Sequence, residues 1–128
     1  MKIVIATKNR GKLSEIKKLI VSTGIEISTL NEFPELTLPV ETGRTFLENA
    51  AGKAQFVARK TGLTSLSDDS GLEVEYLKGA PGVYSARYAG AGATDEENCR
   101  KLLTELKGVP RQERRARFVC VVALAERA

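Results

Sequence analysis

Apolar and polar positions in the first quarter of the chain follow two different periods. Ile3–Ala6 is a continuous apolar run, which is typical of a buried strand. Apolar residues then recur at helical spacing before Gly24, at Leu13, Ile16, Leu19 and Ile20. Ile25 and Ile27 alternate with polar neighbours and predict a second short strand. This strand–helix–strand order favours an α/β fold in which helices cover a sheet.

Two further helices are predicted from capping-box spacing, in which a threonine is followed three residues later by a glutamate. Thr45 and Glu48 open the first, which ends at Gly62 and has an apolar stripe of Phe46, Ala50, Ala54, Val57 and Ala58. Thr94 and Glu97 open the second, whose predicted inward residues are Cys99, Leu102, Leu103 and Leu106. The apolar run 118–124 predicts a central buried strand.

Length and composition indicate one globular domain spanning residues 1–128. Hydrophobic residues make up 42% of the chain, but no apolar run approaches the length that a membrane span requires. Cys99 and Cys120 have neither metal-site nor disulfide spacing. We therefore expect a cytoplasmic protein, without a membrane partner, in which both cysteines are reduced packing residues.

Charge and histidine content narrow the possible chemistry. The net charge of +4 suits an anionic partner such as a nucleotide, a polyphosphate or a nucleic acid. The sequence contains no histidine, so a general base within it must be Asp, Glu, Lys, Tyr or Cys. Histidine-ligated zinc and Ser-His or Cys-His nucleophiles are excluded within this chain.

The acidic stretch Ser67–Gly71 is the first candidate for chemistry. Adjacent side chains on extended backbone point to opposite faces, so Asp68 and Asp69 are predicted to have different roles. Carboxylate oxygens at a strand end suit Mg²⁺, which binds one or two carboxylates together with substrate phosphates. The alternative interpretation is an ordinary turn, because Asp, Ser and Gly are common turn residues.

The second candidate is the basic segment Thr7–Lys12, which lies between a predicted strand and a predicted helix. Backbone amides, a glycine, a helix N-terminus and three cations are the groups with which proteins bind phosphate oxygens. The segment is not a P-loop, because Ala6 and Leu13 occupy the first-glycine and Ser/Thr positions. The alternative is a solvated basic loop.

The third candidate combines Glu41 with a helix face that carries Asn49 and Lys53, four residues apart. Lys53 could neutralise a phosphate and Glu41 could join a metal site, whereas the alternative is a surface lysine lying along apolar surface.

The arginines at 111, 114, 115 and 117 lack interleaved aromatic residues. They are typical of a solvated strand entrance, and we expect no specific nucleic-acid partner.

Four segments in this order resemble the inosine/xanthosine triphosphate pyrophosphatases, which remove non-standard purine nucleotides from the nucleotide pool. The segments are Ile5–Lys12, Glu41–Ala54 (with Thr45-Phe46-Leu47-Glu48-Asn49-Ala50 and Lys53-Ala54), Ser67–Leu72 and Gly79–Tyr88. Each is a moderate signal alone, whereas four in this order, spread over most of the chain, are a strong one.

The resemblance implies a mixed α/β fold with an elongated sheet flooring a cleft between two lobes, usually in a homodimer. It implies Mg²⁺-dependent hydrolysis of ITP, dITP or XTP to the monophosphate and pyrophosphate. By the same resemblance, Asp69 is the proton acceptor for water, and the metal residues are Glu41, Asp69 and, directly or in its second shell, Asp68. The implied substrate-binding residues are Thr7, Lys8, Asn9, Arg10, Gly11, Lys12, Lys53 and Ser70.

The departure from the family lies at the C-terminal end. Relatives continue into a Phe-Gly-Tyr-Asp segment, a further lysine and a Ser-His-Arg motif that grip the purine base, and none of these is in this sequence. We therefore expect a C-terminally truncated form that retains the phosphate and metal half. The alternatives are a non-catalytic polyphosphate-binding or nucleic-acid-binding fragment and a Maf-type nucleotide pyrophosphatase, although the latter has a serine- and arginine-rich N-terminal loop unlike Thr7–Arg10.

Overall fold

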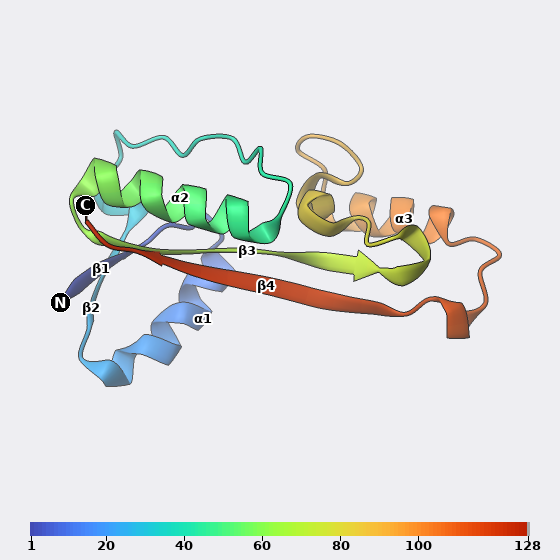
Figure 1. Cartoon of the computed structure of the whole chain (residues 1–128), viewed down its shortest axis with the longest axis horizontal. Coiled ribbons are helices and arrows are strands. Elements are labelled where there is room, and N and C mark those ends of the chain that lie inside the picture. The colour runs from blue at the N-terminus through green and yellow to red at the C-terminus, as the bar shows by residue number, and fades with distance from the viewer. Residues whose placement is uncertain (128) are drawn as a thin grey trace. The chain divides into compact units, whose positions relative to one another are not determined.

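The computed structural model describes residues 1–127, in which four strands form one sheet in the order β2-β1-β3-β4 (Figure 1). β1 pairs in parallel with both neighbours, so Ile3 lies opposite Ile27 of β2 and Thr64 of β3. β4 runs back along β3 in the opposite direction, which makes the sheet mixed (Figure 1). This confirms the predicted mixed α/β class. The strands are β1 (Lys2–Ile5), β2 (Glu26–Thr29), β3 (Thr64–Val74) and β4 (Ala116–Ala125).

Side-chain caps define where the α-helices begin. They are α1 (Arg10–Ile20), α2 (Phe46–Thr61) and α3 (Asp95–Glu105). Asn9, Thr45 and Thr94 are the respective N-caps, and each side chain accepts a hydrogen bond from a backbone N–H in the first turn. Gly62 ends α2 at a φ of 71°, the left-handed conformation that glycine adopts without strain. Both helices predicted from capping-box spacing are therefore confirmed.

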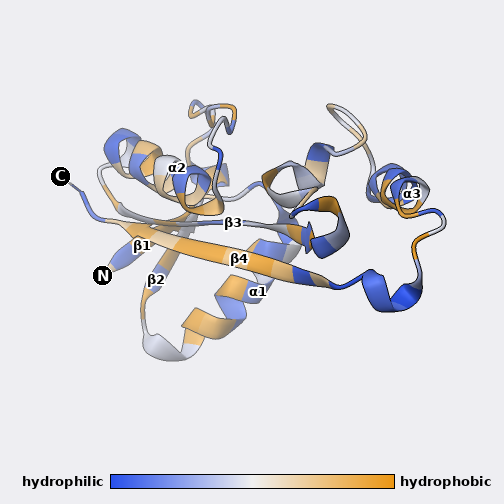
Figure 2. Cartoon of the chain, turned by 45° about the vertical axis from the view of Figure 1, so that its right-hand side comes forward, coloured by the Kyte–Doolittle hydropathy of each residue, from blue (hydrophilic) through white to orange (hydrophobic). Residues whose placement is uncertain are grey.

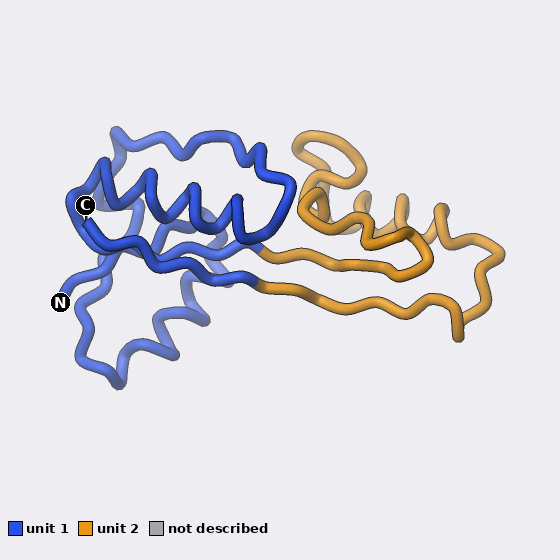
Figure 3. Tube along the Cα trace, in the orientation of Figure 1, with its two compact units in different colours: residues 1–69, 121–128 blue, residues 70–120 orange. Residues whose placement is uncertain are grey.

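The chain divides into two compact units (Figure 3), each with its own core. The first unit comprises residues 1–69 and the end of the chain from residue 121, and its core cluster contains Val4, Ala6 and Val57. The second comprises residues 70–120, and its core cluster contains Val74, Leu106 and Val109. The single domain and the cleft between lobes stay predictions.

In the first unit, α1 and α2 cover opposite faces of the sheet (Figure 1). The predicted apolar stripe of α2 is buried, and a polar residue, Asn49, is buried with it. Alanines in this stripe let the helix backbone approach the sheet closely, and the Ser67 hydroxyl of β3 donates a 2.5 Å hydrogen bond to the Ala50 carbonyl. This contact fixes α2 over the middle of β3, where the two aspartates lie.

The prediction that 118–124 is a central buried strand is wrong. β4 is the edge strand of the described sheet, and Phe118, Val122 and Leu124 are 86%, 59% and 60% exposed. Figure 2 shows the strand as a largely hydrophobic ribbon. A continuous apolar run shows that both faces of a strand are apolar, but it carries no information about which elements cover them.

Three local predictions also require correction. Asp68 and Asp69 lie inside the continuous strand β3, so the turn interpretation is wrong. α1 begins at Arg10, which places the last three residues of the predicted loop in its first turn. Predicted packing residues that are in fact exposed are Leu19, Cys99, Leu103 and Cys120. The spacing of apolar residues alone does not reveal how much of a helix or strand a neighbour covers.

Within residues 1–127, no helix is long and apolar enough to cross a membrane.

Candidate active site

The two adjacent aspartates of β3 project to opposite faces of the sheet and contact different helices. Asp68 Oδ2 lies 2.8 Å from Lys12 Nζ of α1, and Asp69 Oδ2 accepts a 2.9 Å hydrogen bond from Asn49 Nδ2 of α2. Both aspartates are buried. The two carboxylates therefore have different partners, as strand geometry predicts, and their separate roles stay a prediction.

The aspartates lie just past the carboxyl end of β1. The β1–β3 register ends with Ile5 opposite Leu66, so the next residues of β3 extend beyond the neighbouring strand. Thr7 follows the last residue of β1 by two positions, at the same carboxyl end of the strand. In open α/β sheets, ligands bind outside the carboxyl ends of strands, where loops and helix N-termini converge. The fold therefore brings the acidic stretch and the basic Thr7–Lys12 segment to one edge of the sheet.

Asn49 connects three parts of the first unit through one buried side chain, which is 4% exposed. Its Oδ1 accepts a 2.7 Å hydrogen bond from the Gly43 backbone N–H, while its Nδ2 donates to Asp69. A methyl group built on Gly43 would lie only 2.4 Å from Asn49 Oδ1. Glycine at position 43 is thus required by a close approach of side chain to backbone.

Glu41 and Lys53 form an ion pair beside this connection. Lys53 Nζ donates to Glu41 Oε1 at 3.0 Å, and the lysine side chain is only 11% exposed. Lys53 lies one turn after Asn49 on α2, so both side chains point to the same side of the helix. The interpretation of Lys53 as an ordinary surface lysine is therefore wrong.

The pKa of Asp69 is raised above its ordinary value. Burial is the main cause, and the negative charge of Glu41 adds to it. The hydrogen bond from Asn49 and the charges of Lys53 and Lys12 act in the opposite direction. Asp69 therefore lies within electrostatic range of a second carboxylate and two ammonium groups. A carboxylate with a raised pKa is a stronger base than an exposed aspartate.

The remaining predicted substrate residues follow β1 or Asp69 in the chain. Thr7 Oγ1 accepts a hydrogen bond from the Asn9 N–H at 3.1 Å, and Asn9 Oδ1 accepts one from the Lys12 N–H at 3.0 Å. Lys8, Arg10 and Gly11 are exposed. Ser70 follows Asp69 on β3, is partly exposed and begins the second unit. Substrate binding by these residues stays a prediction.

The carboxylates of this site supply part of what a hard divalent cation requires. Within the described residues, no three Asp, Glu, Cys or His side chains are grouped as a complete metal site. Glu41 and Asp69 nevertheless lie close enough for the charge of one to shift the pKa of the other. Two carboxylates fit Mg²⁺ when substrate phosphates and water complete its coordination. Asp68, on the opposite face, is engaged by Lys12.

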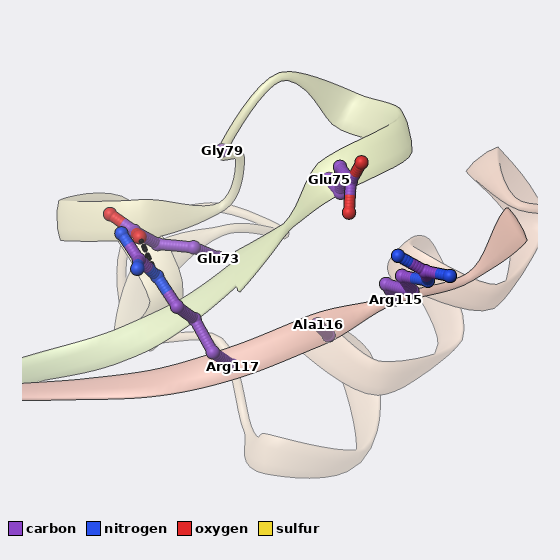
Figure 4. Close-up of a pocket in the computed structure, with 6 residues that line it drawn as sticks. All are labelled: Glu73, Glu75, Gly79, Arg115, Ala116 and Arg117. Carbon is purple, nitrogen blue, oxygen red and sulfur yellow. Dashed lines mark hydrogen bonds and ion pairs between the residues drawn. The ribbon is translucent and has the colours of Figure 1, made fainter.

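Two arginines of the cluster make side-chain contacts within the second unit. Arg114 donates to the Val109 and Leu106 carbonyls at 2.8 and 2.9 Å, which caps the C-terminal end of α3. Arg117 pairs with Glu73 at 2.8 Å across a pocket that Glu75 and Arg115 also line (Figure 4). Alternating charge in this pocket disfavours a uniform cationic surface for nucleic acid.

The buried contacts of Asn49 are not predictable from helical spacing alone. A signal was present: an asparagine stood next to the alanine stripe of a helix at a position that the structure buries. A buried amide requires hydrogen-bond partners, and here both partners are distant in the sequence. Helical periodicity identifies such a residue as unusual but cannot identify its partners.

Comparison with known proteins gives a consistent result. The Ham1 family model matches residues 3–128. The chain is 54% identical over 123 residues to a dITP/XTP pyrophosphatase of Vibrio parahaemolyticus, covering 96% of this chain and 61% of that protein. It is 52% identical over 126 residues to a dITP/XTP pyrophosphatase of Desulforamulus reducens, covering 98% and 63%.

Solved structures with the same fold carry the same family or enzyme names as the sequence relatives. A HAM1 protein from Coxiella burnetii superposes with a TM-score of 0.91 at 44% identity, covering 99% of this chain and 64% of that one. A nucleoside-triphosphatase / dITP/XTP pyrophosphatase from Mycobacterium abscessus gives 0.85 at 40% identity, covering 98% and 66%. The chain thus spans about three fifths to two thirds of the length of these proteins. With this fold and a family match along nearly its whole length, the chain belongs to the Ham1 family.

Proposed function

We propose that this chain carries the phosphate- and metal-binding part of a nucleoside-triphosphate pyrophosphatase that hydrolyses ITP, dITP and XTP. The products are the nucleoside monophosphate and pyrophosphate. The observation that carries the proposal is the buried Asp69, positioned by Asn49 and surrounded by Glu41, Lys53 and Lys12. The names of the Vibrio and Desulforamulus relatives support the substrate class.

Asp69 is the proposed proton acceptor for the attacking water. Its raised pKa brings its basicity closer to that of a group working near neutral pH. Lys53 and Lys12 are the proposed phosphate-binding cations. Each ammonium group lies beside a carboxylate of the site, Glu41 and Asp68 respectively. Positive charge held there offsets the charge that develops on the phosphate oxygens and the leaving group.

Glu41 and Asp69 are the proposed Mg²⁺ ligands, with Asp68 acting through Lys12. When bound, Mg²⁺ would lower the pKa of a coordinated water and screen the phosphate charges. Thr7–Lys12 supplies backbone amides and cations near the carboxyl end of β1, which suits the polyphosphate of the substrate. Ser70 is the proposed contact to the nucleotide from the next position of β3.

A turnover assay tests the proposal. The purified chain is incubated with Mg²⁺ and ITP, XTP, dGTP or dATP, and monophosphate and pyrophosphate are measured separately. We expect equal amounts of both products from ITP and XTP, whereas selectivity against dGTP and dATP comparable to that of a full-length relative would contradict the expected truncated form. Polyphosphate binding without turnover would favour the non-catalytic alternative, and release of orthophosphate would contradict the proposed bond cleavage. The Ham1 match disfavours the Maf-type alternative.

We also propose that the chain forms a homodimer. The exposed apolar residues of β4, among them Phe118 and Val122, support association because an apolar edge strand pairs readily with another chain. We expect multi-angle light scattering to give a mass above the 13.9 kDa of one chain. A concentration-independent monomer mass would contradict this expectation.

A further inference from the structure

We propose that Asn49 is the positioning residue that sets the separation between Glu41 and Asp69, so that one amide side chain assembles the two-carboxylate half of the metal site. The inference rests on the proposed function, because it names the residue on which that metal site depends. Asn49 binds no metal in this proposal. It acts through the groups that it holds.

The hydrogen-bonding chemistry of Asn49 fixes the orientation of its amide. The carbonyl oxygen meets a backbone N–H donor at Gly43, and the NH₂ group meets a carboxylate acceptor at Asp69. In the opposite orientation, two donors would face each other at Gly43 and two acceptors at Asp69. Only one orientation satisfies both neighbours, so the side chain is an oriented link and cannot rotate freely.

This link connects segments that the backbone alone leaves independent. Glu41 lies two residues before Gly43, in a stretch without regular secondary structure that precedes α2. Asp69 lies on β3. Because Asn49 holds Gly43 at one end and Asp69 at the other, it ties the Glu41 segment to the sheet. It also donates a hydrogen bond to Asp69 Oδ2, which orients that carboxylate.

Gly43 provides an independent way to disturb the same contact. A Cβ at this position would lie 2.4 Å from Asn49 Oδ1, which forces the amide or the backbone to move. The φ angle of Gly43 is not in the left-handed region, so alanine is compatible with the backbone there. The damage from Gly43→Ala therefore comes from collision with its neighbours, chiefly the Asn49 amide.

Mn²⁺ binding, followed by electron paramagnetic resonance of the free ion, tests the proposal without requiring turnover. Mn²⁺ prefers the same oxygen ligands as Mg²⁺. We expect Asn49→Ala and Gly43→Ala each to weaken Mn²⁺ binding by about 10- to 100-fold, the usual effect of removing a group that orients a metal ligand. The double variant is expected to lose less than the product of the single losses, because both changes break one contact.

The matched control is Asn98→Ala. Asn98 also uses both ends of its amide, accepting from the Ala89 N–H at 2.8 Å and donating to the Ala86 carbonyl at 3.0 Å, but it lies in the second unit. We expect this variant to bind Mn²⁺ as the unchanged chain does. Equal affinity in Asn49→Ala, or strictly multiplicative losses in the double variant, would overturn the proposal.

Amide hydrogen exchange separates this inference from the proposed function. In Asn49→Ala, exchange at the Gly43 N–H is expected to accelerate, whereas the Glu48 N–H, held by Thr45, keeps its protection. If the unchanged chain binds no Mn²⁺, the proposed metal role is refuted, and Gly43 exchange still decides whether Asn49 is the link. Unchanged Gly43 exchange in Asn49→Ala would overturn the positioning role.

Discussion

Asp69→Asn is expected to reduce Mg²⁺-dependent pyrophosphate release by about 10²- to 10⁴-fold, the usual contribution of a general base. The amide keeps the shape of the side chain and an oxygen that accepts the Asn49 hydrogen bond. It cannot accept a proton from water, and it removes one negative charge from the proposed metal site. Initial rates of pyrophosphate formation from ITP measure the effect, and release at the unchanged rate would refute the assignment of the base.

Thermal unfolding across a pH series provides the control for the fold. Because the pKa of Asp69 is raised in the folded chain, its ionised form is less favourable there than in the unfolded chain. Stability therefore falls as pH rises from the ordinary aspartate pKa through the raised value. Asp69→Asn removes this cost, so we expect a higher Tm than the unchanged chain at neutral pH and a smaller difference in acid. A lower Tm at neutral pH would show that the lost activity reflects damage to the fold.

Lys53→Met is expected to have the second-largest effect, a loss of about 10²- to 10³-fold in turnover, as for removal of one group that stabilises developing charge. The methionine side chain retains most of the apolar stem along α2 but cannot neutralise a phosphate. The change also removes the ammonium group that pairs with Glu41 at 3.0 Å. The rate with ITP, measured over a range of Mg²⁺ concentrations, gives the effect.

Lys60→Met is the matched control for this prediction. Lys60 is on the same helix, but it is exposed and its ammonium group lies 5.7 Å from the centre of the Phe56 ring. The two variants change net charge equally. We expect Lys60→Met to leave turnover unchanged, and equal losses in both would show that overall charge, rather than a phosphate contact at Lys53, controls the rate.

Local signals in the sequence predicted most of the elements. Thr45 and Thr94 begin helices at the expected positions because N-capping depends on neighbouring residues. Gly62 ends α2 for the same kind of local reason. The interpretation of Asp68 and Asp69 as a turn was wrong because tertiary structure overrides their intrinsic preference for turns: both lie in β3, and a lysine and an asparagine contact their carboxylates.

Contacts between residues distant in the sequence could not be predicted from sequence patterns. Strand geometry predicted that the two aspartates face opposite ways, but the contacts of Lys12 with Asp68 and of Asn49 with Asp69 are visible only in the fold. Likewise, the apolar run of β4 predicted a strand correctly but not its position at the edge of the sheet. Hydrophobic pattern reports how apolar a segment is, whereas strand order depends on pairing between distant segments.

The placement of Asp69 inside β3 also determines how the site fails on heating. β3 is an interior strand of the sheet, and interior strands open only when a large part of a domain unfolds cooperatively. The backbone at Asp69 is therefore expected to unfold together with the sheet. Glu41 lies in an irregular segment, and its position depends on side-chain contacts such as the ion pair with Lys53. Mild heating would first release Glu41 and loosen the cation site, and the backbone around the base would remain ordered until the whole sheet melts.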